Sequence, residues 1–200
     1  MTRVWAPPRP VNSRPGKGTF APGPPDNPRP IRGEEARASS EGGNVCEHCG
    51  CQDLAPISEL TREHDLVLTL DYEIRMARQE GDGPRMAELA SRIVAVLAPH
   101  TEVEERGLFP ALAADFPDQI AILEAEHQQI AGVLGEASIG LPEDPAWPDR
   151  LTAALALLRA HIYKEQDGVF PTALASLRTA DWEAMEDIRA RVGSLLPSPA

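Results

Sequence analysis

From residue 58 onward, the apolar residues of the chain recur at steps of three and four, which is the spacing of one face of an α-helix. Five segments carry this pattern: 58–80, 84–106, 117–137, 148–167 and 180–196. No segment alternates between apolar and polar residues in the way of a half-buried strand. Because the linkers between the long segments are short, neighbouring helices should be antiparallel. The pattern therefore predicts an all-α fold: an antiparallel up-down four-helix bundle with an additional C-terminal helix.

Histidine interrupts the apolar stripe of each of the first four predicted helices. These histidines are four of the five in the chain: His64, His100, His127 and His161. Two of them begin a His-x-x-x-Glu step, which places Glu104 and Glu165 one turn further along the same helix face. A buried imidazole or carboxylate is costly unless a partner compensates its polarity. Six such groups directed into one bundle indicate a shared partner, and we predict a metal site.

The two His-x-x-x-Glu steps belong to an internal repeat. Residues 97–112 read LAPHTEVEERGLFPAL, and residues 158–173 read LRAHIYKEQDGVFPTA. Six residues coincide at an offset of 61, including the His, the Glu and a Phe-Pro pair that we expect to form a turn. The dipeptides Glu63-His64 and Glu126-His127 match more faintly, at an offset of 63. Two equivalent helical hairpins would form a pseudo-twofold site, which suits a pair of metal ions.

With these motifs in this order, residues 58–177 resemble the hemerythrin-like, HHE cation-binding family. The resemblance implies a four-helix bundle that holds two non-haem iron ions joined by an oxo or hydroxo bridge. It also implies that Glu104 and Glu165 bridge the ions and that the four striped histidines are terminal ligands. Mixed imidazole and carboxylate ligation suits iron on chemical grounds as well, with manganese and zinc left open.

Two positions depart from the pattern of the oxygen-carrying members. Those members have a second histidine four residues after the first on the third helix, where this chain has Ala131. Their last helix ends in a His-to-Asp step of five, whereas Gln166 stands here and Glu165 takes that part. The chain therefore resembles the four-histidine branch, whose centre keeps a coordination position open. Three unassigned acids could fill it, although we expect them to contact ligand residues or solvent instead: Asp65, Asp71 and Glu126.

All three cysteines and the fifth histidine lie in one hexapeptide, and they are Cys46, His48, Cys49 and Cys51. Thiolate and imidazole groups suit zinc, Cu(I) or an iron–sulfur centre, although four ligands in six residues is tight for one closed site. The alternatives are a reversible disulfide or a thiolate that reaches the metal centre. The third interpretation is that the segment has no defined role. The sequence leaves all three open.

Composition and charge limit the setting and the partners. The formal net charge is −12, and residues 1–33 are basic, so the remainder is more acidic still. Such a body disfavours nucleic acid and anionic lipid as partners. No apolar run is long enough to span a membrane, and no secretory signal is evident, so we expect a cytoplasmic protein. The oligomeric state is left open.

We divide the chain into three parts. Residues 1–45 are rich in Pro, Gly and Arg, and we expect a disordered tail. The same bias is typical of translated GC-rich upstream sequence, which makes Val45 an alternative start site. Residues 46–51 form the Cys/His motif, and residues 55–200 form the bundle with its C-terminal helix.

Three functions fit these features. The first is reversible binding of dioxygen, nitric oxide, peroxide or iron, for sensing or in a stress response. The second is a di-iron enzyme that decomposes hydrogen peroxide or reduces nitric oxide. The third is iron donation or iron–sulfur repair. We favour the first, because no acid–base pair or substrate pocket can be inferred outside the metal ligands.

Overall fold

The computed structural model describes residues 54–196, and every regular element within them is a helix. The α-helices are α1 Ala55–Glu80, α2 Gly83–Val103, α3 Phe109–Leu112, α4 Pro117–Gly135, α5 Trp147–Lys164, α6 Phe170–Ser176 and α7 Thr179–Val192. Two π-helical turns, η2 Glu104–Leu108 and η3 Glu165–Val169, connect α2 to α3 and α5 to α6. The all-α prediction is confirmed for these residues. The predicted tail and the motif at residues 46–51 lie outside them.

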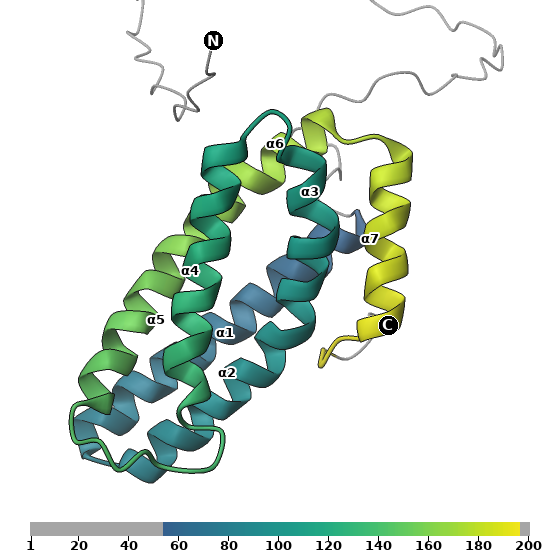
Figure 1. Cartoon of the computed structure of the whole chain (residues 1–200). Helices are drawn as coiled ribbons and strands as arrows, with labels where there is room; N and C mark the ends of the chain where they lie inside the picture. The colour runs from purple at the N-terminus through teal and green to yellow at the C-terminus, as the bar shows by residue number, and fades with distance from the viewer. Residues whose placement is uncertain (1–53, 197–200) are drawn as a thin grey trace, which may run out of the picture.

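The four long helices α1, α2, α4 and α5 lie side by side, and successive helices run in opposite directions (Figure 1). Helix α1 packs against α2 and α5, and α4 packs against the same two helices. Helix α7 lies along the outside of the bundle, where it packs on η2, α2 and α1. None of the helices between residues 54 and 196 is long and apolar enough to cross a membrane.

The ends of α1 and the start of α2 follow from local sequence. Helix α1 begins three residues before the predicted residue 58, with Pro56 in its first turn. Proline suits that position, because its missing N–H would have no partner within the helix. Gly81 ends the helix in a left-handed conformation with φ 74°. Asp82 then caps α2, since its side chain accepts a hydrogen bond of 2.9 Å from the backbone N–H of Arg85.

The predicted turns at the two Phe-Pro pairs are wrong, because the helical path continues through both. Pro110 and Pro171 cannot donate a backbone hydrogen bond, and a proline ring in a regular helix crowds the carbonyl four residues back. A wider π-helical turn relieves this conflict: the N–H of Phe109 bonds to the carbonyl of Glu104, five residues back. Phe170 makes the equivalent bond to the carbonyl of Glu165. Each π-helical turn therefore begins at a predicted metal ligand.

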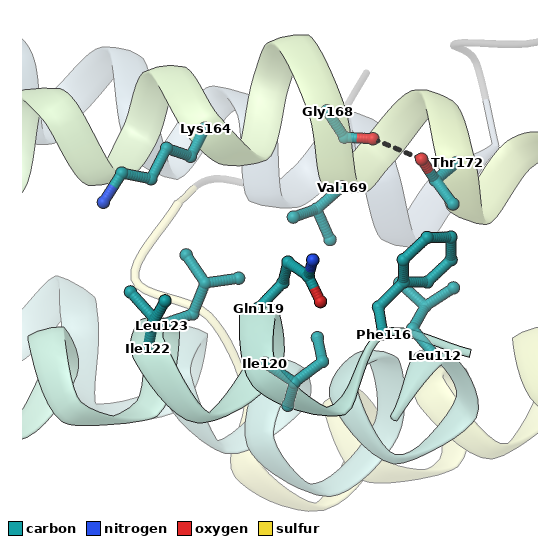
Figure 2. Close-up of a pocket in the computed structure, with 10 residues that line it drawn as sticks. All are labelled: Leu112, Phe116, Gln119, Ile120, Ile122, Leu123, Lys164, Gly168, Val169 and Thr172. Carbon is teal, nitrogen blue, oxygen red and sulfur yellow. Dashed lines mark hydrogen bonds between the residues drawn. The ribbon is translucent and has the colours of Figure 1, made fainter. Parts of the chain in front are cut away.

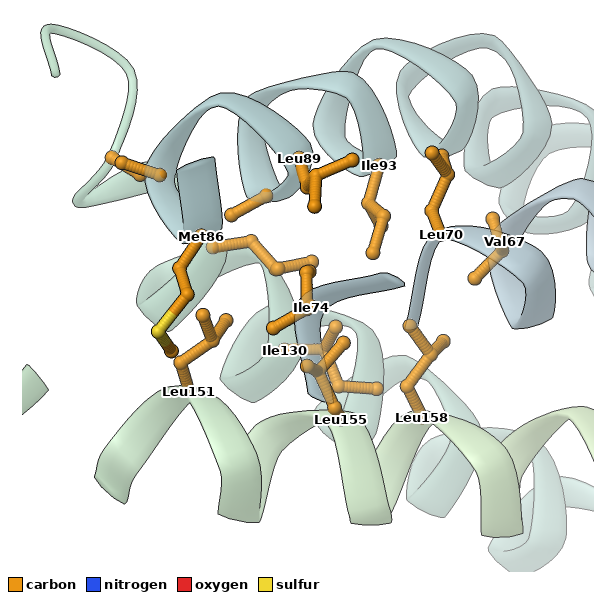
Figure 3. Close-up of a cluster of buried hydrophobic side chains, with 14 of the residues drawn as sticks. Val67, Leu70, Ile74, Met86, Leu89, Ile93, Ile130, Leu151, Leu155 and Leu158 are labelled. Atoms are coloured by element: carbon orange, nitrogen blue, oxygen red, sulfur yellow. The ribbon is translucent and has the colours of Figure 1, made fainter. Parts of the chain in front are cut away.

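The buried apolar residues form two clusters with a polar layer between them. The first cluster fills the end of the bundle near the α1–α2 turn, where Leu70, Ile74 and Leu155 meet (Figure 3). The second lies at the other end and includes residues of α3, α6 and α7. Along α1, Leu60 belongs to the second cluster and Val67 to the first, with His64 between them. The apolar clusters thus enclose the histidine layer from both ends.

Candidate metal centre

The six side chains that the sequence analysis singled out come together in the middle of the bundle. They form two groups whose ligand atoms lie within 4.8 Å of one another: His64, His100, Glu104 and Glu165 in one, and His127, His161 and Glu165 in the other. Each long helix contributes one histidine, and Glu104 and Glu165 begin η2 and η3. The shared Glu165 joins the two groups into one centre.

In the first group, nitrogen and oxygen atoms face one another at short range. Nε2 of His64 lies 3.1 Å from Nε2 of His100 and 3.2 Å from Oε2 of Glu165. Nε2 of His100 is 3.2 Å from Oε2 of Glu104. Two imidazoles and two carboxylates thus present their electron pairs to the same small volume, as the ligands of a cation do.

The second group faces the other oxygen of Glu165 and the same oxygen of Glu104. Oε1 of Glu165 lies 2.9 Å from Nε2 of His161 and 3.9 Å from Nε2 of His127. Oε2 of Glu104 is 3.5 Å from Nε2 of His127. Both carboxylates therefore lie between the two histidine pairs, where a bridging ligand would have to be.

The centre holds a set of buried polar atoms that the rest of the protein does not satisfy. Among the described residues, both carboxylate oxygens of Glu104 and of Glu165 are buried without a hydrogen-bond partner, as is Nε2 of His161. Native proteins leave few such groups unpaired, since each carries a desolvation penalty. Nitrogen and oxygen donors that converge in this way fit a divalent transition-metal ion.

Three of the four histidines are held by a carboxylate on the ring nitrogen that faces away from the centre. Nδ1 donates to the acid in each case: His100 to Glu63 at 3.0 Å, His127 to Glu105 at 3.0 Å, and His161 to Glu126 at 2.9 Å. Such a bond fixes the tautomer and the ring orientation, and it leaves Nε2 free to bind a metal. This arrangement is common among histidines that ligate metals.

The three unassigned acids of the sequence analysis take different places. Glu126 contacts a predicted ligand residue, His161, as expected. Asp71 is buried but bonds to Arg159 at 2.7 Å, and Asp65 is exposed, so neither fills the open position. The roles of Glu63 and Glu105 were missed. Only the match between Glu63-His64 and Glu126-His127 could have indicated the first of them.

The charges of the centre are strongly coupled. Burial lowers the pKa of His100, but the attraction of the Glu104 carboxylate, 3.2 Å away, outweighs it and raises the pKa to about 10. Burial also opposes protonation of His161, yet Glu165 raises the pKa of that imidazole to about 9. Burial raises the pKa of Glu165, whereas His161 holds it well below its usual range. Both histidine pKa values therefore report a centre that attracts positive charge.

A cavity of about 340 Å³ reaches the centre from between α2 and α4, and all four histidines line it. Ala131 forms part of its wall, four residues after His127, at the position where the oxygen-carrying pattern would place a second histidine. Leu97 and Leu134 give the wall an apolar character, and Thr101 adds a hydroxyl group. The short side chain of Ala131 leaves space beside His127 for a small molecule.

Residues 54–173 match the family model described as the hemerythrin HHE cation-binding domain. This range contains all six clustered side chains and ends before α7. No curated protein and no solved structure matches the chain.

Proposed function

The chain belongs to the hemerythrin HHE cation-binding family, and from this premise we propose that it holds two non-haem iron ions that bind a small molecule reversibly. The observation that carries the proposal is the pair of ligand groups that share Glu165 beside a cavity. The small molecule would be dioxygen, nitric oxide or peroxide, and its binding would serve sensing or a stress response.

The residues divide the work of holding the ions. His64 and His100 would hold one ion, and His127 and His161 the other. Glu165 belongs to both groups, and Glu104 lies near a histidine of each, so both carboxylates would be shared. When bound, iron supplies a redox-active Lewis acid with an open coordination position. The acids on the outer ring nitrogens of His100, His127 and His161 would keep Nε2 of these three rings deprotonated and directed inward.

The cavity supports a small, uncharged ligand. Apolar side chains such as Val94, Leu97 and Leu158 form much of its wall, and the imidazole rings form its inner end. The apolar part of this wall favours dioxygen or nitric oxide over an anion, because an anion would meet a larger desolvation penalty there. The enzymatic alternative would use the same residues, so turnover is the measurement that separates the two functions.

Metal analysis of the purified protein, combined with its optical spectrum, tests the proposal. We expect two iron ions per chain and a spectral change on addition of nitric oxide that saturates without consuming the gas. Sustained oxygen evolution from added hydrogen peroxide would instead assign the enzymatic function. Fewer than two metal ions per chain after reconstitution with Fe²⁺ would refute the two-ion proposal.

Substitution of Ala131 by phenylalanine should block the cavity while the iron content stays unchanged. The added ring would occupy the space that Ala131 leaves in the wall. We expect nitric oxide to associate at least about tenfold more slowly, which corresponds to about 1.4 kcal/mol of added barrier. Stopped-flow absorbance measures this rate.

Ala125→Phe is the matched control, because Ala125 is also exposed on α4 but does not line the cavity. It should bind nitric oxide at the wild-type rate. If Ala131→Phe retained both ions and also bound at that rate, the cavity would not be the route to the centre.

A further inference from the structure

The C-terminal helix α7 reaches the metal centre through Arg189. Nη1 of Arg189 donates to Oε1 of Glu63 at 3.0 Å, and Nη2 donates to Oε2 at 2.8 Å. The Ser194 hydroxyl adds a hydrogen bond of 2.7 Å to Oε1 of Glu63. Oε2 of Glu63 also accepts the bond from Nδ1 of His100 at 3.0 Å. A buried carboxylate with two-point Arg contact is firmly oriented, so α7 fixes the partner of one metal ligand.

Close packing holds α7 in this position. Met185 and Ile188 are buried in the second apolar cluster. Gly107 of η2 permits the approach, since a Cβ at that position would lie 2.8 Å from Cγ of Met185. Arg189 also forms an ion pair of 3.2 Å with Glu59 of α1. Helix α7 is thus anchored on the half of the bundle that carries His64 and His100.

The half of the bundle that carries His127 and His161 has an equivalent surface, and no helix of residues 54–196 covers it. Gly168 is the repeat counterpart of Gly107, and it lines an apolar groove of about 280 Å³ (Figure 2). Ile120 and Leu123 lie on the opposite side of that groove, at the positions that match Ile57 and Leu60 beneath α7. The pseudo-twofold symmetry of the sequence is therefore broken in the structure by α7.

The outer carboxylates differ accordingly between the two halves. Glu126 is the repeat counterpart of Glu63. Whereas Glu63 accepts two hydrogen bonds from Arg189, Glu126 accepts one from the ammonium group of Lys164, whose side chain is 43% exposed. Glu105, the partner of His127, is 37% exposed at its side chain, whereas Glu63 is 1% exposed. Solvent competes for an exposed acceptor, so His127 is less firmly oriented than His100. Glu126, the acceptor of His161, is 13% exposed, but the exposed Lys164 holds it less firmly than Arg189, which is 12% exposed, holds Glu63.

We propose that α7 makes the two metal positions unequal, because Arg189 and Ser194 fix Glu63 and thereby hold His100 in its ligating orientation. The ion held by His64 and His100 is retained, and the ion held by His127 and His161 exchanges. Arg189 is a positioning residue in this scheme, since it acts through Glu63 and His100. The inference rests on the proposed two-ion centre.

The inference is tested by the rate at which the full-length chain releases Fe²⁺ to an excess of a ferrous chelator. Absorbance under anaerobic conditions measures this rate. The wild-type protein should release two ions in two phases of equal amplitude. Arg189→Met should accelerate the slow phase about 10–100-fold, the range for loss of an outer partner of a metal ligand. Lys164→Met, the matched loss of a cation beside Glu126, should accelerate only the fast phase.

Ser194→Ala gives a second variant that removes only one hydrogen bond to Glu63, from a residue beyond the end of α7. It should accelerate the slow phase by less than Arg189→Met does. Loss of both wild-type ions in a single phase would overturn the inference while leaving the two-ion centre intact. An equal acceleration of both phases by Arg189→Met would also overturn it, since that result reports general destabilisation. A wild-type chain that binds fewer than two ions would refute the proposed function itself.

Discussion

Replacement of Glu165 by alanine should prevent binding of both metal ions of the proposed centre. Glu165 is the side chain common to both ligand groups, and it is fully buried between them. Its Oε2 lies 3.2 Å from His64 and its Oε1 lies 2.9 Å from His161. Loss of an outer partner alone lowers metal affinity about 10–100-fold, so loss of a shared ligand should exceed about 100-fold. Elemental analysis after gel filtration should then find less than about a tenth of the wild-type metal.

Asp167→Ala provides the control for Glu165→Ala. It removes the same charge from the same π-helical turn, but Asp167 is exposed. This variant should keep both ions. The short contacts of the Glu165 carboxylate are with His64, His127 and His161 of the centre itself, so we expect the metal-free Glu165→Ala bundle to remain folded. Retention of two ions by a folded Glu165→Ala protein would refute the assignment of Glu165 as a shared ligand.

The main helices and the six clustered side chains could be predicted because both depend on local periodicity. Residues three and four apart share a helix face, so the stripe that contains Leu60 and Val67 also placed His64 in the core. The predicted starts of the second to fifth helices differ from the observed ones by one residue or none. The internal repeat then required the two hairpins to present equivalent groups to one another.

Features that depend on pairing across the fold could not be predicted in the same way. The contact between Arg189 and Glu63 joins residues 126 apart, and helical periodicity does not specify which faces meet. The π-helical turns could not be predicted, because a Phe-Pro pair in a sequence is typical of the end of a helix. In the structure, a wider π-helical turn accommodates each proline, and the helix continues. The difference that α7 makes between the two halves of the bundle could not be predicted for a related reason. The sequence repeat indicates two equivalent halves, and it does not show on which half the C-terminal helix packs.

Removal of the metal should make the stability of the protein dependent on pH above about 6.5. In the metal-free chain the pKa of His100 is raised to about 10 and that of His161 to about 9, against 6.5 for an ordinary histidine. Between these limits the folded chain binds more protons than the unfolded chain, so the free energy of unfolding falls as the pH rises. The contribution of these histidines is complete below pH 6.5 and is lost as the pH passes through 9 and 10.

Bound metal should abolish this pH dependence, because the ion takes the place of the protons between the histidines and carboxylates. At a free metal concentration 1,000-fold above its Kd, each ion adds about 4 kcal/mol to the free energy of unfolding. With about 2–4 °C per kcal/mol for a domain of this size, Tm should rise about 8–16 °C per ion. Thermal unfolding from pH 6 to 10, with Fe²⁺ or with a chelator, measures both effects. Glu165→Ala lacks the carboxylate that raises the pKa of His161, so its metal-free Tm should fall less over this range. A flat profile for the metal-free wild type would show that the histidines do not take up protons from the solvent in place of the metal.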